Sequence, residues 1–443
     1  MLETIKEIML DFQESQWEDS VPRRLELRRV AKKATMVIGA RRAGKSTFLL
    51  QVARGLVAGG VARQNLVHVN FFDDRLYPLR QAGCAPVLEA VWQLYPEKKD
   101  REKMYFFFDE IQTVPGWEAF VERLLRTEKC EVFLTGSSAH LLSRELATAM
   151  RGRALSWELF PYSFREFLTA TGVPAPANLT TRARLAVRQA FTQYWESGGF
   201  PEVTGQPRGV RVRIHQEYLH AMLFRDILER HDSSHPRAVT DLAHRLADNV
   251  GSLYSINKLT AQLKDAGHRI PKTAVAQILD WFEDAYFLFP VRLYDASFAR
   301  SNVNPKKVYC IDHAMARSIG SGVLLNDGHL LENLVFLGLR RRAQEVFYYR
   351  CKSGREVDFL VMLPERRRLL VQVCLTLADP ATRKRELAAL GDAMGELDLP
   401  EAVLVTRDEE ETVALDGRAV RIVPAWRFLL ELDSDAPDAA GVG

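Results

Sequence analysis

The sequence predicts an α/β protein: a parallel sheet covered by helices on both faces, followed by a helical and winged-helix segment and a mixed α/β C-terminal domain. Two observations indicate the parallel sheet. Strand-like and helix-like segments alternate from residue 34 to residue 135, and residues 104–108 form a continuous apolar and aromatic run. Such alternation is typical of parallel strands joined by crossover helices, and a continuous apolar run indicates a strand buried on both faces.

The individual elements follow from spacing and residue type. Apolar residues at helical spacing predict a leading helix at residues 2–16. Runs of β-branched and aromatic residues, bounded by polar turns, predict the strands. We expect strands at residues 35–38, 65–71, 104–108 and 131–135, and further helices at residues 46–56, 85–95 and 117–126.

Composition narrows the class of protein. A chain of 443 residues, 47% hydrophobic and 26% charged, predicts globular material with more than one domain. The net charge of +3 does not by itself indicate a nucleic-acid partner. Five widely spaced cysteines without a C-x-x-C pair favour reduced thiols over disulfides or a zinc site. An acidic start and the lack of a membrane-length apolar stretch predict a cytoplasmic protein that does not associate with membranes.

A complete G-x-x-x-x-G-K-[ST] pattern lies between the first predicted strand and the helix after it. It consists of Gly39, Ala40, Arg41, Arg42, Ala43, Gly44, Lys45 and Ser46, followed by Thr47. In a loop of this kind, backbone N–H groups and the helix N-terminus hold phosphates, the lysine reaches the β- and γ-phosphates, and the hydroxyl ligates Mg²⁺. Residues 39–47 are therefore predicted to bind ATP, with Lys45 on the phosphates and Ser46 on the metal.

Two carboxylates end the apolar strand at residues 104–108. Ligands of open α/β sheets bind at the carboxyl ends of the strands, which is where Asp109 and Glu110 stand. Asp109 is predicted to hold Mg²⁺ through water, and Glu110 to polarise the water that attacks the γ-phosphate. With the loop, these residues predict an ATP hydrolase.

Two further positions are predicted to assist hydrolysis. Ser137, after the fourth strand, is our choice for a side chain that senses the γ-phosphate; Thr135 is the alternative, and a plain Gly-Ser turn is an equal reading. Arg151 and Arg153 follow, and a guanidinium inserted from a neighbouring subunit stabilises transition-state charge in related chemistry. A solvated basic loop explains either arginine alone equally well.

With these residues in place, the chain resembles a family of archaeal and bacterial AAA+-type ATPases. In that family an ATPase core precedes a helical and winged-helix segment and a domain similar to PD-(D/E)xK nucleases. The resemblance implies ATPase activity, assembly into a ring such as a hexamer, and a role for Arg153 in completing a neighbour's site. It rests on residues 39–47, 70–75, 109–112, 136–138, 152–153, 160–167, 198–202, 307–312 and 356–359.

The resemblance divides the chain into five parts. They are a P-loop ATPase domain at 1–165, a helical region at 166–250, a winged helix-turn-helix at 251–325, a PD-(D/E)xK-like domain at 326–433 and a flexible tail at 434–443. In the winged segment we expect a helix at 259–263, a second helix that begins near Pro271, and a wing built from residues 287–289 and 291–293. The second helix has one lysine, Lys272, so docking to DNA and docking to protein are equally favoured.

The C-terminal domain is predicted to be catalytically degenerate. Glu332 and Asp358 stand where a nuclease centre has metal-binding carboxylates. Gln372, however, replaces the second acid of the motif, and Cys374 replaces its lysine. A neutral amide and a thiol do not supply these charges, so the sequence argues against nuclease activity.

Basic clusters occur along the nearly neutral chain and are candidates for phosphate contacts, although each alone reads as a solvated face. They lie at residues 23–24, 28–29, 32–33, 208–213, 340–342, 355, 366–368 and 383–385. The leading prediction is an oligomeric, ATP-driven motor or remodeller that acts on DNA. The alternatives are a nucleotide-dependent switch that binds protein partners and, more weakly, a nuclease coupled to ATP hydrolysis.

Overall fold

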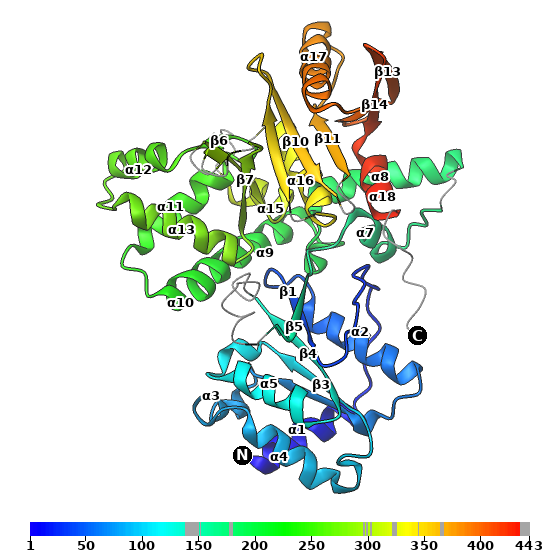
Figure 1. The fold of residues 1–443 in the computed structure, drawn as a ribbon, viewed down its shortest axis with the longest axis vertical. Coiled ribbons are helices and arrows are strands. Elements are labelled where there is room, and N and C mark those ends of the chain that lie inside the picture. Colours follow the sequence, from blue (N-terminus) through cyan, green and yellow to red (C-terminus); the bar gives the residue numbers. More distant parts are fainter. Residues whose placement is uncertain are drawn as a thin grey trace. The chain divides into compact units, whose positions relative to one another are not determined.

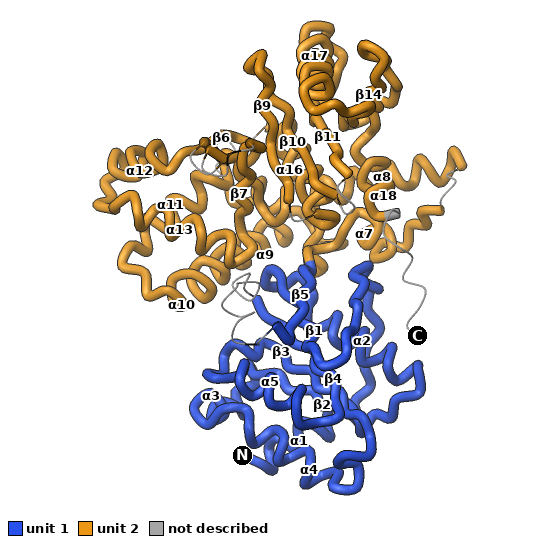
Figure 2. Tube along the Cα trace, in the orientation of Figure 1, with its two compact units in different colours: residues 1–159, 439–443 blue, residues 160–438 orange. Residues whose placement is uncertain are grey.

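The chain forms two compact units, which Figure 2 distinguishes by colour. In this computed structural model the first unit is Met1–Leu159 and the second begins at Phe160. The structure describes residues 1–137, 150, 152–176, 180–295, 297, 300–301, 304–320, 326–343, 345–363 and 367–434. Apart from Ser434, the tail predicted at 434–443 lies outside these residues. Within the described ranges, no helix is both long enough and apolar enough to cross a membrane.

The first unit is built on a five-stranded sheet in which every pairing is parallel (Figure 1). The strand order is β2-β3-β4-β1-β5. The strands are β1 (Ala34–Ile38), β2 (Leu66–Asn70), β3 (Met104–Asp109), β4 (Cys130–Gly136) and β5 (Ala154–Glu158). This confirms the predicted parallel α/β sheet. Strand β5 was not predicted from the sequence, because it lacks an apolar run and all of its residues are only half-buried.

Helices cover both faces of this sheet. They are α1 (Leu2–Glu14), α2 (Lys45–Ala58), α3 (Leu79–Ala82), α4 (Ala85–Leu94) and α5 (Trp117–Thr127). Phe107 of β3 stacks on Phe133 of β4 at 4.9 Å and shares a core cluster with Phe48 of α2. Phe108, the next residue of β3, lies 6.0 Å from Phe120 of α5. Because successive strand side chains point to opposite faces, α2 and α5 cover opposite faces of the sheet.

The second unit begins with helices and continues into a mixed sheet (Figure 1). Its first helices are α7 (Phe164–Ala170), α8 (Thr181–Ser197), α9 (Arg208–Ala221), the π-helical η7 (Met222–Leu228), α10 (Glu229–His231), α11 (Pro236–Ala247), α12 (Ile256–Asp265) and α13 (Lys272–Asp284). The later helices are α15 (His313–Ile319), α16 (Asp327–Arg340), α17 (Pro380–Leu397) and α18 (Ala425–Ser434). Helices are therefore present in the region expected to be helical, and α12 and α13 lie where the two helices of the winged segment were expected.

The sheet of this unit has the order β13-β14-β12-β11-β10-β9-β7-β8-β6 and mixes parallel with antiparallel pairs. Its strands are β6 (Leu253–Tyr254), β7 (Leu288–Leu293), β8 (Lys306–Cys310), β9 (Val346–Arg350), β10 (Glu356–Met362), β11 (Arg368–Val373), β12 (Glu401–Thr406), β13 (Glu411–Leu415) and β14 (Arg418–Pro424). Strands of the expected winged segment thus continue into the sheet of the C-terminal segment.

The two segments expected in the wing, residues 287–289 and 291–293, largely belong to one continuous strand, because β7 runs through Pro290. Pro290 pairs with Val308, so it does not end the strand. The antiparallel hairpin is formed by β7 and β8, and β7 also pairs in parallel with β9.

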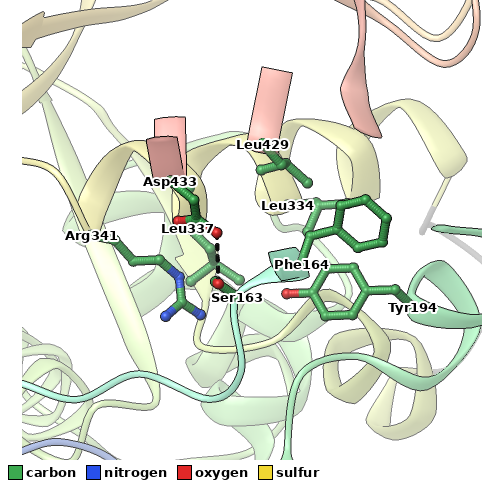
Figure 3. Close-up of a pocket in the computed structure, with 9 residues that line it drawn as sticks. Ser163, Phe164, Tyr194, Leu334, Leu337, Arg341, Leu429 and Asp433 are labelled. Atoms are coloured by element: carbon green, nitrogen blue, oxygen red, sulfur yellow. Dashed lines mark hydrogen bonds between the residues drawn. The ribbon is translucent and has the colours of Figure 1, made fainter. Parts of the chain in front are cut away.

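Three hydrogen bonds join distant segments of the second unit. Gly199 donates its N–H to Oδ2 of Asp312 at 2.7 Å, and its carbonyl accepts from the N–H of Tyr162 at 2.6 Å. Ser163 donates to Oδ2 of Asp433 at 2.7 Å, beside a small pocket lined by Phe164 and other side chains (Figure 3). The beginning of the unit is thereby tied to its last described helix.

Candidate nucleotide site

The glycine-rich loop has a backbone that its glycines make possible. Gly39 follows β1 with φ 150°, and a Cβ at this position would lie 2.1 Å from the carbonyl oxygen of Leu159. Gly44 adopts a left-handed conformation, φ 96°, directly before α2. Both positions exclude a side chain, one for space and the other for backbone conformation. The conformation of the loop between β1 and α2 therefore depends on these two glycines.

The ammonium group of Lys45 is held inside this loop. The lysine is 5% exposed, and Nζ donates to the carbonyl oxygens of Gly39 and Ala40 at 3.0 Å each. The same Nζ lies 3.8 Å from Oε1 of Glu110. The cation thus stands between the loop and the acidic end of β3.

The two carboxylates are fixed by strand β4, which lies between β1 and β3. The hydroxyl of Thr135 donates to Oδ1 of Asp109, and it accepts the backbone N–H of Glu110 at 2.9 Å. Asp109, Thr135 and Ser137 are all buried, the last two completely. Both of the small polar residues that the sequence singled out therefore lie on the segment between the loop and the carboxylates.

Glu110 has a strained backbone and a side-chain partner that the sequence analysis did not assign. Its φ is 53°, in the left-handed region that non-glycine residues rarely adopt. Nε2 of Gln112 donates to Oε2 of Glu110 at 2.5 Å. Oε1 of Gln112 is buried and makes no hydrogen bond within the described part of the chain. The only sequence signal for this residue is its place two positions after the acid.

Comparison with known proteins identifies the family of the chain. It is 31% identical over 420 residues to the uncharacterized protein MJ1544 of Methanocaldococcus jannaschii, covering 93% of this chain and 91% of that protein. The chain belongs to the MJ1544 family. An uncharacterized protein of Haemophilus influenzae is 29% identical over 398 residues, which cover 88% of this chain and 93% of that protein.

Family models match three segments of this MJ1544-family chain. Residues 31–168 match an AAA domain, and residues 188–324 and 327–428 match two domains of unknown function, DUF8612 and DUF4143. Among solved structures, the ORC1 protein of Aeropyrum pernix in complex with DNA is 14% identical with a TM-score of 0.31, covering 72% of this chain and 90% of that one. At this TM-score the likeness bears on neither partners nor assembly. The AAA match spans the loop and the carboxylates, and it supports a nucleotide-binding domain in the first unit.

The rest of the predicted loop lines the start of α2 in the AAA domain. Ala40 and Ala43 are buried, whereas Arg42, Ser46 and Thr47 are exposed. Two arginines make contacts that stabilise the loop. Nη1 of Arg23 donates to the carbonyl oxygen of Ala43 at 2.7 Å. The guanidinium of Arg41, within the loop, lies 5.6 Å from the centre of the Phe72 ring. These contacts fit a preformed phosphate cradle with exposed hydroxyls in the first turn of the helix.

Arg153 lies within the AAA domain just before β5. Its Nη1 is 3.7 Å from Oε1 of Glu122 on α5. The predicted role in a neighbouring subunit would require this ion pair to open. Arg151 lies outside the described residues.

The site fits MgATP by its own geometry. Gly39 approaches the backbone too closely for a side chain, Lys45 is oriented towards an acid, and Ser46 is exposed at the N-terminus of a helix of 14 residues. A glycine loop that leads into a helix N-terminus, a buried ammonium group and an exposed hydroxyl in the first turn of that helix fit a magnesium-bound triphosphate.

Proposed function

We propose that the first unit binds MgATP and hydrolyses it. The observation that carries this proposal is the Lys45 ammonium, held by two loop carbonyls and 3.8 Å from Glu110. Residues 39–47 receive the phosphates, and Ser46 and Asp109 hold Mg²⁺. Bound Mg²⁺ neutralises charge on the phosphate oxygens.

Glu110 and two residues on and after β4, Thr135 and Ser137, have the remaining proposed roles in hydrolysis. Glu110 orients and polarises the attacking water. Thr135 acts as a positioning residue, because its one hydroxyl contacts both the Asp109 side chain and the Glu110 backbone. Ser137, two positions further along the chain, contacts the γ-phosphate. Its complete burial supports this role, because a group that reads a phosphate in a closed site is shielded from water.

Nucleotide binding by the purified chain tests the proposal. A fluorescent ATP analogue should bind in the presence of Mg²⁺, and inorganic phosphate should be released on incubation with ATP. A chain that binds no nucleotide at millimolar concentration contradicts the proposal, whatever its other activities.

We propose further that the unit works in a homo-oligomeric ring, with Arg153 completing the site of the next subunit. Within the chain Nη1 of Arg153 lies 3.7 Å from Oε1 of Glu122, and the arginine side chain is 33% exposed, so a neighbouring subunit can reach it once this ion pair opens. Particle mass measured by light scattering with and without ATP tests the assembly. An Arg153→Ala variant that assembles but hydrolyses at the normal rate contradicts the role of this arginine.

DNA is the partner we favour for the second unit, and its helix-turn-helix supports this. Four cations, Lys258, Lys264, Arg269 and Lys272, are located on α12, the turn and the start of α13, and none has an ion pair or hydrogen bond from its side chain among the described residues. The accessible side of α13 also presents Thr273 and Gln277. Cations that flank such a helix contact phosphates, while polar side chains on it reach base edges.

Several other basic residues that the sequence offered as candidates for phosphate contacts already have partners within the second unit. Within the second unit, Arg355 pairs with Asp392, Arg383 with Glu411 and Arg385 with Glu386. The cluster at 340–342 is half-buried, and Arg341 donates to the carbonyl oxygen of Pro161 at 2.5 Å. Because these arginines have partners within the unit, the helix-turn-helix remains the preferred DNA surface.

A nucleotide-dependent switch that binds protein partners is the second candidate. It is favoured by large apolar side chains exposed on helices of the second unit: Leu185 is 61% exposed, and Val210 and Phe224 are 43% exposed. ATP turnover measured with duplex, single-stranded and branched DNA at low salt separates the two functions. Stimulation by DNA supports the motor, whereas slow, DNA-independent turnover with an ATP-dependent change in assembly supports the switch.

A further inference from the structure

A buried lysine stands among three carboxylates in the sheet of the second unit. Nζ of Lys307, on β8, lies 2.9 Å from Oε1 of Glu332 on α16, 3.1 Å from Oε1 of Glu356 and 2.8 Å from Oδ1 of Asp358, both on β10. The lysine side chain is 5% exposed. Tyr309, two residues along β8, donates its hydroxyl to Oε1 of Glu332 at 2.6 Å.

Two of these acids are the ones that the nuclease-like pattern predicts as metal ligands. In a nuclease centre, carboxylates of this kind hold Mg²⁺. Here Oε1 of Glu332 and Oδ1 of Asp358 are both bonded to the Lys307 ammonium. The other oxygen of Asp358 accepts the backbone N–H of Val373 at 2.9 Å. Among the residues that the structure describes, no group of acids, histidines and cysteines is arranged to hold a metal ion.

Gln372, at the position of the second acid of the motif, also has hydrogen-bond partners for its side chain. Oε1 of Gln372 accepts the N–H of Asp358 at 3.0 Å, and Nε2 donates to Oε2 of Glu386 at 2.7 Å. Cys374, where the motif has lysine, contacts the carbonyl oxygen of Thr376 through Sγ at 3.1 Å, and burial raises the pKa of its thiol. Neither side chain is directed to a metal, so a divalent cation does not fit this centre.

We propose that the ammonium group of Lys307 takes the place of the divalent cation, which makes this centre a metal-independent junction of β8, α16 and β10. A covalently attached cation needs no supply of metal and cannot activate water, since an ammonium has no open coordination position. Removing the ammonium leaves three carboxylates facing one another, which is the donor set of a Mg²⁺ or Mn²⁺ site.

The charge state of the centre agrees with this assignment. Burial alone would lower the pKa of Lys307, but the charges of Asp358 and Glu332 raise it well above its usual value, so the lysine is permanently charged. The centre therefore holds one fixed positive charge against the carboxylates. Breaking a buried arrangement of this kind by removing one partner is strongly destabilising, unless another cation enters.

Manganese binding tests the proposal on the full chain without nucleotide. Mn²⁺ titrations, followed by electron paramagnetic resonance, compare the wild type with Asp358→Asn, Lys307→Ala and Lys306→Ala. The first unit contributes equally to all four proteins, so differences report on the second unit. Lys306, next to Lys307 on β8, points to the opposite face of the sheet and is the matched control.

The wild type, Lys306→Ala and Asp358→Asn should bind the same number of Mn²⁺ ions. Lys307→Ala should bind one more, and saturating Mn²⁺ should raise its unfolding temperature by about 5 °C more than it raises that of the wild type. A Mn²⁺ site in the wild type that is lost in Asp358→Asn overturns the proposal, and this comparison does not require Lys307→Ala to fold. A folded Lys307→Ala that gains no Mn²⁺ site overturns it as well.

Discussion

The side-chain amide of Gln112 donates a 2.5 Å hydrogen bond to Oε2 of Glu110, the carboxylate proposed to activate water. Oε1 of Glu110 meanwhile faces Lys45 at 3.8 Å. The carboxylate is thus held from both oxygens, by an amide two residues away and by the lysine of the phosphate loop. Its orientation depends on contacts that the motif pattern alone does not contain.

Substitutions of Lys45 and of Glu110 should separate nucleotide binding from hydrolysis. Lys45→Ala should lose nucleotide binding, because it removes the buried ammonium that is proposed to contact the phosphates. Glu110→Gln should bind ATP with normal affinity but hydrolyse it about 100-fold more slowly. Binding is measured with a fluorescent analogue and turnover by phosphate release. An unchanged rate for Glu110→Gln would mean that another residue activates the water.

Gln112→Ala should lower kcat about tenfold and leave KM nearly unchanged, because it removes one hydrogen bond to a charged group and no contact to the proposed substrate. Gln112→Glu should lower kcat further, since two carboxylates would repel each other. Gln93→Ala is the matched control: its amide also contacts a glutamate, Glu89, but on the exposed surface of α4. Equal effects of Gln112→Ala and Gln93→Ala on kcat would contradict a positioning role for Gln112.

Gly198→Ala should destabilise the second unit by about 3 kcal/mol, because a Cβ would lie 2.2 Å from Oδ1 of Asp312 and φ is 76°. Gly172→Ala separates the two causes: its φ is 69°, but nothing lies within 4 Å of an added Cβ. This control should cost only about 1 kcal/mol. Thermal unfolding followed by circular dichroism measures both variants, and equal losses would show that backbone strain accounts for the whole effect.

Stability should depend on pH through Glu332. Burial and the neighbouring charge of Asp358 raise its pKa from 4.5 to about 7, although Lys307 and the Tyr309 hydroxyl oppose the shift. Between these pH values the folded chain binds more protons at Glu332 than the unfolded chain does. The stabilisation is therefore fully present below about pH 4.5 and is lost as the pH rises towards 7.

Unfolding temperatures from pH 5 to pH 8 check this prediction by comparing the wild type with Glu332→Gln. The wild type should lose stability relative to the variant as the pH rises. Burial and the charge of Lys307 lower the pKa of His329, one turn earlier on α16, and this histidine is present in both proteins, so the comparison isolates Glu332. Parallel curves for the two proteins would contradict the raised pKa of Glu332.

DNA binding should depend on the cations of the helix-turn-helix. The triple variant Lys264→Ala, Arg269→Ala, Lys272→Ala should weaken binding to duplex DNA and flatten the dependence of log Kd on log salt, by about 0.9 for each lost phosphate contact. Lys99→Ala with Arg101→Ala removes exposed cations from the first unit and serves as the control. Fluorescence anisotropy at several salt concentrations measures both, and identical slopes for all proteins would exclude this surface as the DNA site.

The sequence by itself determined the parallel sheet and the elements of the nucleotide site. A phosphate loop is local: its glycines, lysine and serine are neighbours in the chain, and the carboxyl ends of parallel strands meet at one edge. Asp109 and Glu110 are therefore assigned to the same edge as Lys45 by the order of strands, loop and helix along the chain. Local pattern also identified the two helices around Pro271.

Only the tertiary structure decided which partners these side chains have. The hydrogen bond between Gln112 and Glu110 depends on the left-handed backbone of Glu110. The hydrogen bond from the N–H of Gly199 to Asp312 joins residues that are far apart in the chain. Strand β5 was missed because an edge strand that is half-buried carries no apolar run. Lys307 contacts Glu332 and Asp358 because β8, α16 and β10 pack together in the fold. Spacing along the chain does not predict which charged side chains such packing brings together.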